Sequence, residues 1–276
     1  MARITRTPDV NAIAREMMSA QDAVRQIEPF TSHLNGFDVP TAYDVAHVIH
    51  QARLEAGAVP VGRKIGFTNP EMLTLYGVSE PIWAYIYDTT VLRLSGNVGV
   101  CSIGRFAEPK IEPEIVVHFD SAPAVDAGPS AILGCIDWIA HAFEIVQSHF
   151  PGWKFQAPDT VADSGLHGTL LVGEPQPIDR LGADLIAALE RFSIALSCEG
   201  KLCEVGRGSN VLGSPLAPVA HLIAVLAKQP QYAPLQAGEM VSTGTLTAAL
   251  PVHAGETWST ELTGIALPGL FVKLIA

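Results

Sequence analysis

Two glutamates, Glu112 and Glu114, stand two residues apart in the apolar segment 111–119. Residues two apart in a β-strand project from the same face, so this spacing predicts two neighbouring carboxylates. Like charges this close repel each other unless a proton or a cation lies between them. A solvent-facing pair on an edge strand would have the same spacing. However, Ile115 and Val117 alternate with the acids, which places Glu112 and Glu114 on a face separate from the core.

The segment 136–150 is predicted to be a helix with one polar stripe. The stripe has the spacing i, i+4, i+7, i+11 and consists of Asp137, His141, Glu144 and Ser148. A solvated helix face explains such a stripe, but His141 and Glu144 could also offer two ligands to one metal. If Glu144 joins Glu112 and Glu114, the ligands are all oxygen and favour Mg²⁺ or Mn²⁺. Zinc is the alternative if His141 coordinates.

A lysine and a hydroxyl-rich segment are further candidates. Lys64 lies among apolar residues and glycines in the segment 61–68, where backbone can approach a ligand closely. A partly buried lysine has a lowered pKa and can exchange protons near neutral pH, whereas a surface lysine on a strand does neither. In the segment 241–247, hydroxyls and backbone N–H groups around Gly244 could cradle a carboxylate, although threonine-rich segments are also simply good strands.

The elements that must position these residues change along the chain. Residues 8–57 have helical apolar spacing, with a second helix predicted to open at Thr41 in a capping box with Asp44. From residue 59 onward, short β-like runs alternate with Gly and Pro, and a helix at 218–227 interrupts them. We therefore predict an α+β protein with a helical N-terminal region, residues 1–58, and a β-rich catalytic domain, residues 59–276.

Composition excludes several classes of function. The 276 residues carry 17 Lys+Arg against 28 Asp+Glu, a formal net charge of −11, without the clustered basic residues that nucleic acids or anionic membranes require. Neither a membrane span nor a secretory signal is predicted, so we expect a cytoplasmic protein. Four cysteines do not suggest a disulfide framework, although Cys198 and Cys203 could face each other across a hairpin.

Five segments together resemble the fumarylacetoacetate hydrolase superfamily, in the branch of 2-hydroxypenta-2,4-dienoate hydratases and 4-oxalocrotonate decarboxylases. The resemblance covers nearly the whole chain, and no single segment is specific for the branch. The segments are VGRKIGFT (61–68), LYGVSEPIWAYI (75–86), EPKIEPEIVVHF (108–119), HAFEIVQSHFPGWKFQAPDTVADSGLHG (141–168) and GEMVSTGTLTAALPVHAGE (238–256).

The resemblance implies a mixed β-roll and a role for each candidate. The implied ligands of a divalent cation, Mg²⁺ or Mn²⁺, are Glu112, Glu114 and Glu144. The implied catalytic residues are Lys64, which transfers protons, together with Asp163 and His167 from the site-lining stretch 159–167. The implied substrate-binding residues are Ser242, Thr243, Gly244 and Thr245, which would hold a carboxylate or oxo group. Phe67 and Trp83 could shape the pocket, although aromatic residues in strands are more often part of the core.

The implied activity is the metal-dependent addition of water to a 2-hydroxy-2,4-dienoate or its 2-oxo tautomer in aromatic ring-cleavage catabolism. Decarboxylation of an oxalocrotonate-like diacid needs the same enolate, and a tautomerase or C–C hydrolase is a further alternative. Ile82 stands where the hydratases, as aligned here, carry an acid. This departure raises one alternative from another class, an inactive partner subunit. The resemblance also implies a homo-oligomer or a complex with a paralogous hydratase or decarboxylase.

Overall fold

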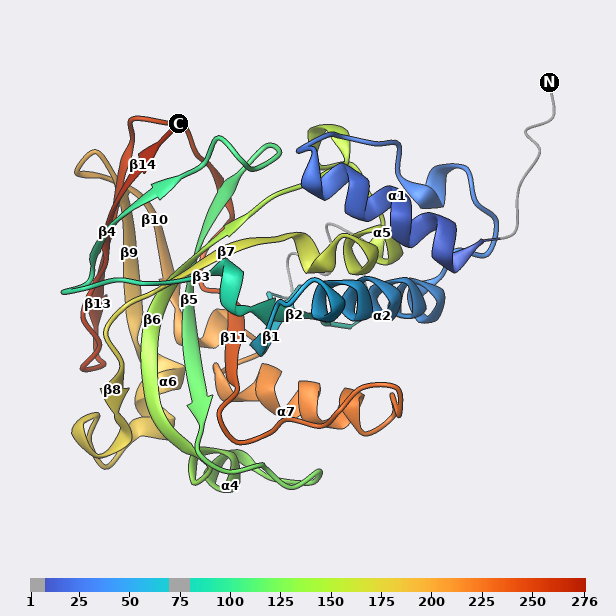
Figure 1. Ribbon diagram of the computed structural model, residues 1–276. Coiled ribbons are helices and arrows are strands. Elements are labelled where there is room, and N and C mark those ends of the chain that lie inside the picture. The colour runs from blue at the N-terminus through green and yellow to red at the C-terminus, as the bar shows by residue number, and fades with distance from the viewer. Residues whose placement is uncertain (1–7, 70–79) are drawn as a thin grey trace.

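The computed structural model describes residues 8–69 and 80–276, which form six α-helices and two β-sheets (Figure 1). The helices are α1 (Val10–Asp22), α2 (Val39–Glu55), α4 (Pro129–Leu133), α5 (Ala157–Ala162), α6 (Leu185–Arg191) and α7 (Leu216–Leu226). The strands of the larger sheet are β1 (Pro60–Gly66), β2 (Ile82–Tyr87), β3 (Val91–Arg93), β5 (Lys110–Phe119), β6 (Ile136–Val146), β7 (His167–Val172), β8 (Gln176–Pro177), β11 (Met240–Thr245) and β12 (Leu250–Pro251). Those of the smaller sheet are β4 (Val98–Ser102), β9 (Ser193–Cys198), β10 (Lys201–Arg207), β13 (Thr257–Thr263) and β14 (Phe271–Ile275). The predicted α+β class is confirmed.

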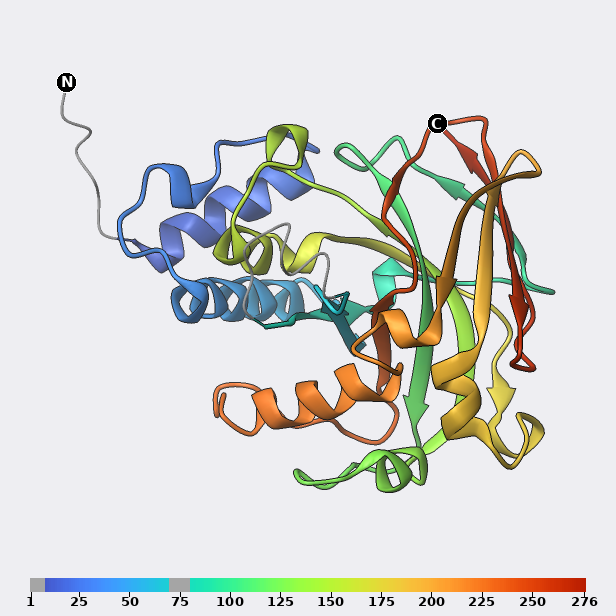
Figure 2. The ribbon, with the colours of Figure 1, turned by 180° about the vertical axis from the view of Figure 1, so that it is seen from behind.

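The two sheets and the helices form separate sides of the molecule. The larger sheet has the order β2-β1-β11-β5-β6-β7-β3, and the smaller one has the order β10-β9-β13-β14-β4. Views from front and back show α1, α2 and α7 together on one side and the smaller sheet on the other (Figures 1 and 2). Buried side chains such as Phe143 of β6, Trp258 of β13 and Val272 of β14 form a core between the sheets. The strands that carry the candidate residues therefore lie in the middle of the molecule.

The two N-terminal helices start at aspartate caps. The Asp9 side chain accepts a hydrogen bond from the backbone N–H of Ala12 at the start of α1. The Asp38 side chain accepts one from the N–H of Thr41, so α2 begins at Val39 and the predicted start at Thr41 is wrong. An aspartate cap satisfies an N–H group that the helix itself cannot pair, which explains the earlier start. Both helices share one hydrophobic core with later elements, and the 58/59 boundary stays a prediction.

The largest error of the sequence analysis concerns the segment 136–150. It is predicted as a helix, but residues 136–146 form β6, which pairs with both β5 and β7. A central strand is covered on both faces and reads as a nearly continuous apolar run, so the period of two that marks a half-exposed strand is missing. The predicted polar stripe therefore does not exist, and His141 and Glu144 project from opposite faces of β6.

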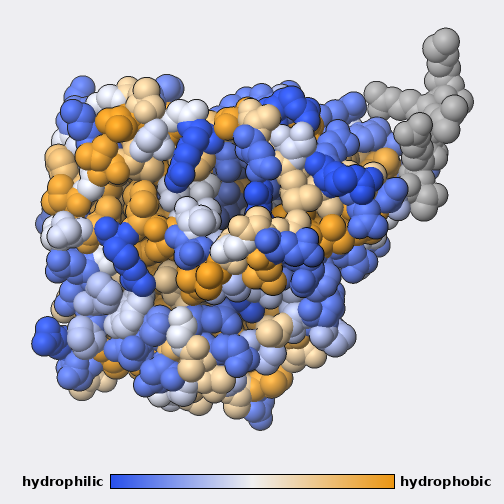
Figure 3. Space-filling view, in the orientation of Figure 1, coloured by the Kyte–Doolittle hydropathy of each residue, from blue (hydrophilic) through white to orange (hydrophobic). Residues whose placement is uncertain are grey.

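Other predictions can be compared directly with the fold. The helix predicted at 218–227 is present as α7. All four cysteines are free thiols, including Cys198 and Cys203. Among the described residues, each helix lacks the length or the hydropathy needed to cross a membrane. Residues 75–79 of one resembling segment lie outside the described part of the chain. The face drawn in Figure 3 mixes hydrophilic and hydrophobic side chains and is hollowed between the sheet side and the helical side.

Candidate active site

The three candidate glutamates converge because of strand register. Glu112 and Glu114 share one face of β5, and the pairing of β5 with β6 sets Glu112 directly opposite Glu144. One carboxylate oxygen from each residue lies within 4.8 Å of the others. Glu114 and Glu144 are fully buried, and Glu112 is partly exposed. Three carboxylates thus meet inside the molecule, although their role as metal ligands stays a prediction.

Electrostatics make this cluster unfavourable as three bare anions. Burial, with repulsion from Glu144, raises the pKa of Glu112 to about 7. Burial and repulsion from Glu144 and Glu112 raise the pKa of Glu114 well above its ordinary value. Oε1 of Glu114 is buried and has no hydrogen-bond partner among the described residues. An all-oxygen donor set with an unpaired buried oxygen fits a hard divalent cation.

Lys64 faces the same cluster from β1, which pairs with β2 on one side and β11 on the other. Its Nζ donates a hydrogen bond to the Gly165 carbonyl at 2.9 Å and lies 3.1 Å from Oε2 of Glu144. Burial alone would lower the pKa of Lys64, but attraction to Glu144, Glu112 and Glu114 outweighs it and raises this pKa. The predicted lowering is therefore wrong in sign, because burial was considered without the surrounding carboxylates.

The pKa of Glu144 is displaced in the opposite direction to those of its two neighbours. Its burial favours the protonated form, but the Lys64 ammonium and the His167 imidazole more than compensate and lower the pKa of Glu144. His167 begins β7, with Nδ1 2.7 Å from Oε1 of Glu144 and Nε2 2.9 Å from Oγ1 of Thr90. The structure therefore brings the predicted residue His167 to Glu144, where it orients the carboxylate.

Most residues of the segment 242–245 on β11 hold Glu114 or the backbone in place and do not line the pocket. The Ser242 hydroxyl and the Gly244 N–H both donate to Oε2 of Glu114. Gly244 has φ +100°, and a Cβ there would lie 1.9 Å from Oγ1 of Thr68, so glycine is required. The Thr243 hydroxyl donates to the Ile115 carbonyl. Only Thr245 of the four lines the pocket, and the others act through Glu114 or the backbone.

Asp163 is also held away from the pocket. Its carboxylate lies 2.8 Å from Nδ1 of His149 and accepts a further hydrogen bond from the His149 backbone N–H. Both residues are fully buried. Asp163 therefore fixes the chain that leads to His167, and its predicted catalytic role stays a prediction.

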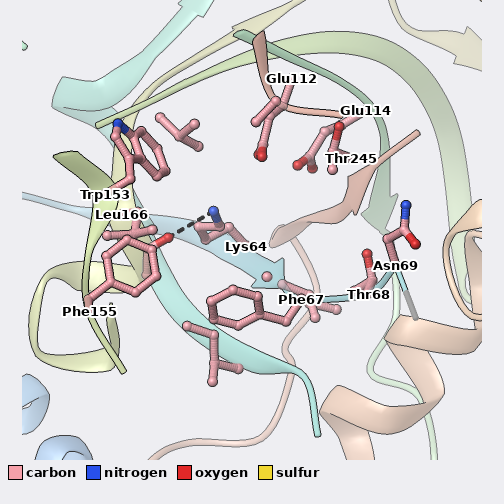
Figure 4. A pocket seen from close by; sticks show the side chains of 16 residues that line it. Lys64, Phe67, Thr68, Asn69, Glu112, Glu114, Trp153, Phe155, Leu166 and Thr245 are labelled. Atoms are coloured by element: carbon pink, nitrogen blue, oxygen red, sulfur yellow. Dashed lines mark hydrogen bonds between the residues drawn. The ribbon is translucent and has the colours of Figure 1, made fainter. Parts of the chain in front are cut away.

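The pocket beside the cluster has an apolar wall (Figure 4). Phe67, Ile82, Trp153, Phe155 and Leu166 line it, as do Lys64, Glu112 and Glu114. Phe67 thus lies where it was predicted. Trp83 does not line this pocket, because alternate residues of β2 face opposite sides and its indole packs on Tyr43 and donates to Gln229.

Sequence reasoning missed Trp153 and Phe155, whereas Leu166 falls within the stretch 159–167 that was expected to line the site. These residues lie within the segment 141–168 that carries the resemblance, but nothing in their types separates pocket-lining from core positions. Trp153 is placed by its Nε1, which donates to the Glu108 carbonyl, and Leu166 by a tight turn before β7.

The zinc alternative that relied on His141 is wrong. Its Nδ1 contacts the Glu114 carbonyl at 2.9 Å and its Nε2 contacts Oγ1 of Thr260 on β13 at 2.9 Å. Both ring nitrogens are therefore engaged on the face of β6 that points to the smaller sheet.

Comparison with known proteins agrees with this arrangement. Protein-family models give no match. The chain is 28% identical over 253 residues to 2-keto-4-pentenoate hydratase of Paraburkholderia xenovorans, which covers 91% of this chain and 90% of the hydratase. The solved structure of 4-oxalocrotonate decarboxylase from Pseudomonas putida G7, complexed with magnesium and adipate, matches with a TM-score of 0.87 and 26% identity over 98% of this chain and all of that one.

Over nearly its whole length the chain is thus similar to hydratases and decarboxylases of the fumarylacetoacetate hydrolase superfamily. More distant members of the superfamily share its fold. A fumarylacetoacetate hydrolase family protein from Yersinia pestis matches with a TM-score of 0.55 and 17% identity, over 78% of this chain and 94% of that one. Within the hydratase and decarboxylase branch the match extends over nearly the whole chain, so the N-terminal helices belong to the shared architecture.

Proposed function

We propose that this protein is a divalent-metal-dependent hydratase that adds water to a 2-hydroxy-2,4-dienoate, or its 2-oxo tautomer, in aromatic ring-cleavage catabolism. The observation that carries the proposal is the buried cluster of Glu112, Glu114 and Glu144 with Lys64 beside it, at the end of a pocket with an apolar wall. The similarity to 2-keto-4-pentenoate hydratases over nine-tenths of the chain supports the same substrate class.

The three glutamates would hold Mg²⁺ or Mn²⁺. When bound, the cation supplies Lewis acidity next to the carboxylate and 2-oxygen of the substrate. Ser242 and Gly244 donate hydrogen bonds to Oε2 of Glu114, which leaves Oε1 available as a ligand for the cation. His167 fixes the Glu144 carboxylate in the same way.

Lys64 would carry the proton that moves between the substrate oxygen and carbon. Its Nζ lies 3.1 Å from Oε2 of Glu144, beside the place where the cation would hold the substrate. The Gly165 carbonyl directs one N–H bond of Nζ, which leaves the remaining N–H groups for the carboxylates and the substrate. Phe67, Phe155 and Ile82 would give the hydrocarbon end of the substrate an apolar wall.

Decarboxylation of a 2-oxo diacid such as 4-oxalocrotonate is the second candidate. Two observations favour it: the close structural match to a 4-oxalocrotonate decarboxylase, and the apolar residue Ile82 in the pocket wall. Among the described lining residues the ionisable groups are Lys64, Glu112 and Glu114, so the hydrocarbon end offers neither an acid nor a base to a water molecule. Loss of CO₂ needs no such group.

One experiment separates these candidates. Purified protein is incubated with Mg²⁺ or Mn²⁺ and a panel of 2-oxo-enoates and oxo-diacids, and the ultraviolet absorbance of the conjugated acid is followed together with CO₂ release. Loss of absorbance without CO₂ supports the hydratase, and CO₂ release from a diacid supports the decarboxylase. A protein that binds the metal yet turns over none of the panel would contradict both and favour the inactive partner subunit.

A further inference from the structure

The turn that precedes β7 adopts a backbone conformation that requires support from outside. Ser164, Gly165 and Leu166 have φ values of +52°, +64° and +63°. Side-chain-bearing residues rarely adopt this region, so Ser164 and Leu166 are strained unless their surroundings hold them. Only Gly165 is a glycine. The contacts around this turn therefore determine whether it keeps its shape.

One side of the turn, its front, faces the pocket that contains Lys64. The Gly165 carbonyl accepts the hydrogen bond from Nζ of Lys64, and Leu166 lines the catalytic pocket. The space at Gly165 is also restricted, because a Cβ there would lie 3.3 Å from Cδ of Lys64. A displacement of the turn would therefore move the acceptor that directs the Lys64 amine.

The back of the turn is held by the N-terminal helices. Nε2 of Gln21, near the end of α1, donates to Oδ1 of Asp163 and to Oγ of Ser164, both at 3.2 Å. Oε1 of Gln21 accepts a hydrogen bond of 3.1 Å from Nη2 of Arg53 on α2. One amide thus ties two helices to the two residues at the start of the turn.

Gln21 and the catalytic pocket lie on opposite sides of this turn. Gln21, Arg53, Ser164 and His167 line a second cavity of about 330 Å³. Neither Gln21 nor Arg53 lines the pocket that contains Lys64. The hydrogen bonds of Gln21 thus meet the turn from the side opposite the pocket.

We propose that Gln21 is a positioning residue that fixes the turn at 164–166, so that the Gly165 carbonyl holds the Lys64 amine in its reactive orientation. The inference rests on the proposed function, because it assigns to Lys64 the proton transfer named there. It gives α1 a role in the reaction itself, in addition to its part in the hydrophobic core.

The test compares Gln21→Met with Gln26→Met. Methionine keeps the length of the side chain and removes its hydrogen bonds. Gln26 is the matched control, since it lies in the same region and donates at 3.4 Å to the Ser148 carbonyl rather than to a residue of 163–166. We expect Gln21→Met to lower kcat about tenfold, with KM and Mn²⁺ affinity unchanged, because only orientation is lost. Gln26→Met should retain the wild-type kcat.

A double-mutant cycle separates positioning from a general structural effect. In a Lys64→Ala background, Gln21→Met should have no further effect on the rate, since the group that it positions is absent. The same tenfold loss in both backgrounds would overturn the proposal. Should Gln21→Met fail to fold, Ser164→Ala removes one of the two bonds to the turn and enters the same cycle.

Hydrogen exchange provides a readout that does not need turnover. Amides of residues 164–168 should exchange faster in Gln21→Met than in the wild type or in Gln26→Met. If the wild type acts on no substrate of the panel, the proposed function fails, and unchanged exchange in Gln21→Met would then show separately that Gln21 does not hold the turn. Faster exchange with an unchanged kcat in an active enzyme would also overturn the proposal.

Discussion

The two ends of the catalytic pocket are built differently. The charged end comes from three paired strands, β1, β5 and β6, whose register fixes where Lys64 and the glutamates point. The apolar end comes mainly from chain between strands and from the start of the edge strand β2, where Trp153, Phe155 and Ile82 lie. A paired strand in a sheet centre can hardly change without loss of the fold, whereas connecting segments can. On the proposed function, the metal chemistry therefore belongs to the first end and the choice of substrate to the second.

The largest effect is expected at the charged end. Glu114→Gln keeps the shape of the side chain but removes a charge from the cluster, so we expect loss of Mn²⁺ binding and of detectable turnover. Isothermal titration with Mn²⁺ and the absorbance assay measure both. Glu261→Gln, an exposed change on β13, is the matched control and should behave as wild type. Metal-free activity in Glu114→Gln would show that the cluster is not a catalytic metal site.

At the same end of the pocket, Lys64→Ala should slow the reaction without removing the bound metal. We expect the rate to fall by roughly 10²-fold or more, the usual loss for a general acid–base group, while Mn²⁺ still binds. Steady-state kinetics measure the rate, and titration measures the Mn²⁺ affinity. Lys273→Ala on β14 serves as the control. A rate close to wild type would remove Lys64 from the mechanism.

A smaller and selective effect is expected at the apolar end. Phe155→Ala removes part of the wall, so a substrate with a longer hydrocarbon end should lose up to about tenfold in kcat/KM relative to a shorter one. Metal affinity should be unchanged, because the three glutamates and the groups that hold Glu114 and Glu144 are left in place. Phe271→Ala, an exposed aromatic change on β14, provides the control. An equal loss for all substrates would contradict the division between the two ends.

The smallest effect concerns the reverse face of β6. Burial lowers the pKa of His141 to about 4, against about 6.5 in an unfolded chain. Between these values the unfolded chain binds a proton that the native protein does not, so this residue destabilises the fold as the pH falls below about 6.5. At pH 7.5, His141→Gln should be less stable than the wild type because hydrogen bonds are lost.

Urea unfolding at two pH values isolates this contribution from that of the glutamates. Between pH 7.5 and pH 5 the deficit of His141→Gln should shrink by about 1–2 kcal/mol, at about 1.4 kcal/mol per pKa unit. A deficit that is constant with pH would mean that His141 titrates in the native protein as it does in the unfolded chain, and a deficit that grows at low pH would mean that the native protein binds the proton more tightly.

The charged end could be predicted from the sequence because its signals are local. The two-residue spacing of Glu112 and Glu114 identified a shared face, and the resemblance added Glu144 despite the wrong secondary structure of its segment. The direction in which the pKa of Lys64 is shifted could not be predicted in the same way, since it depends on three carboxylates from two other strands. The roles assigned to Asp163, Ser242 and Trp83 stay predictions, but the structure places none of them in the pocket wall.

The apolar end could not be predicted for a different reason. Trp153 and Phe155 differ from core aromatic residues only in which side of a loop they occupy, and that depends on long-range packing. The helix predicted for β6 shows the same limit. A strand buried on both faces has no solvent-facing residues to mark its period, so the partners β5 and β7 decide its conformation.

The register of β5 against β6 also offers a way to detect molecules whose strands are misaligned. Because side chains alternate along a strand, a slip of one residue would turn Glu144 to the other face and leave Glu112 opposite an apolar side chain. A chain with that error could be compact and contain the same amount of sheet, yet its three glutamates would not converge on the proposed cation site. The fraction of protein that takes up the cation would thus count correctly paired molecules, which circular dichroism cannot distinguish from misaligned ones.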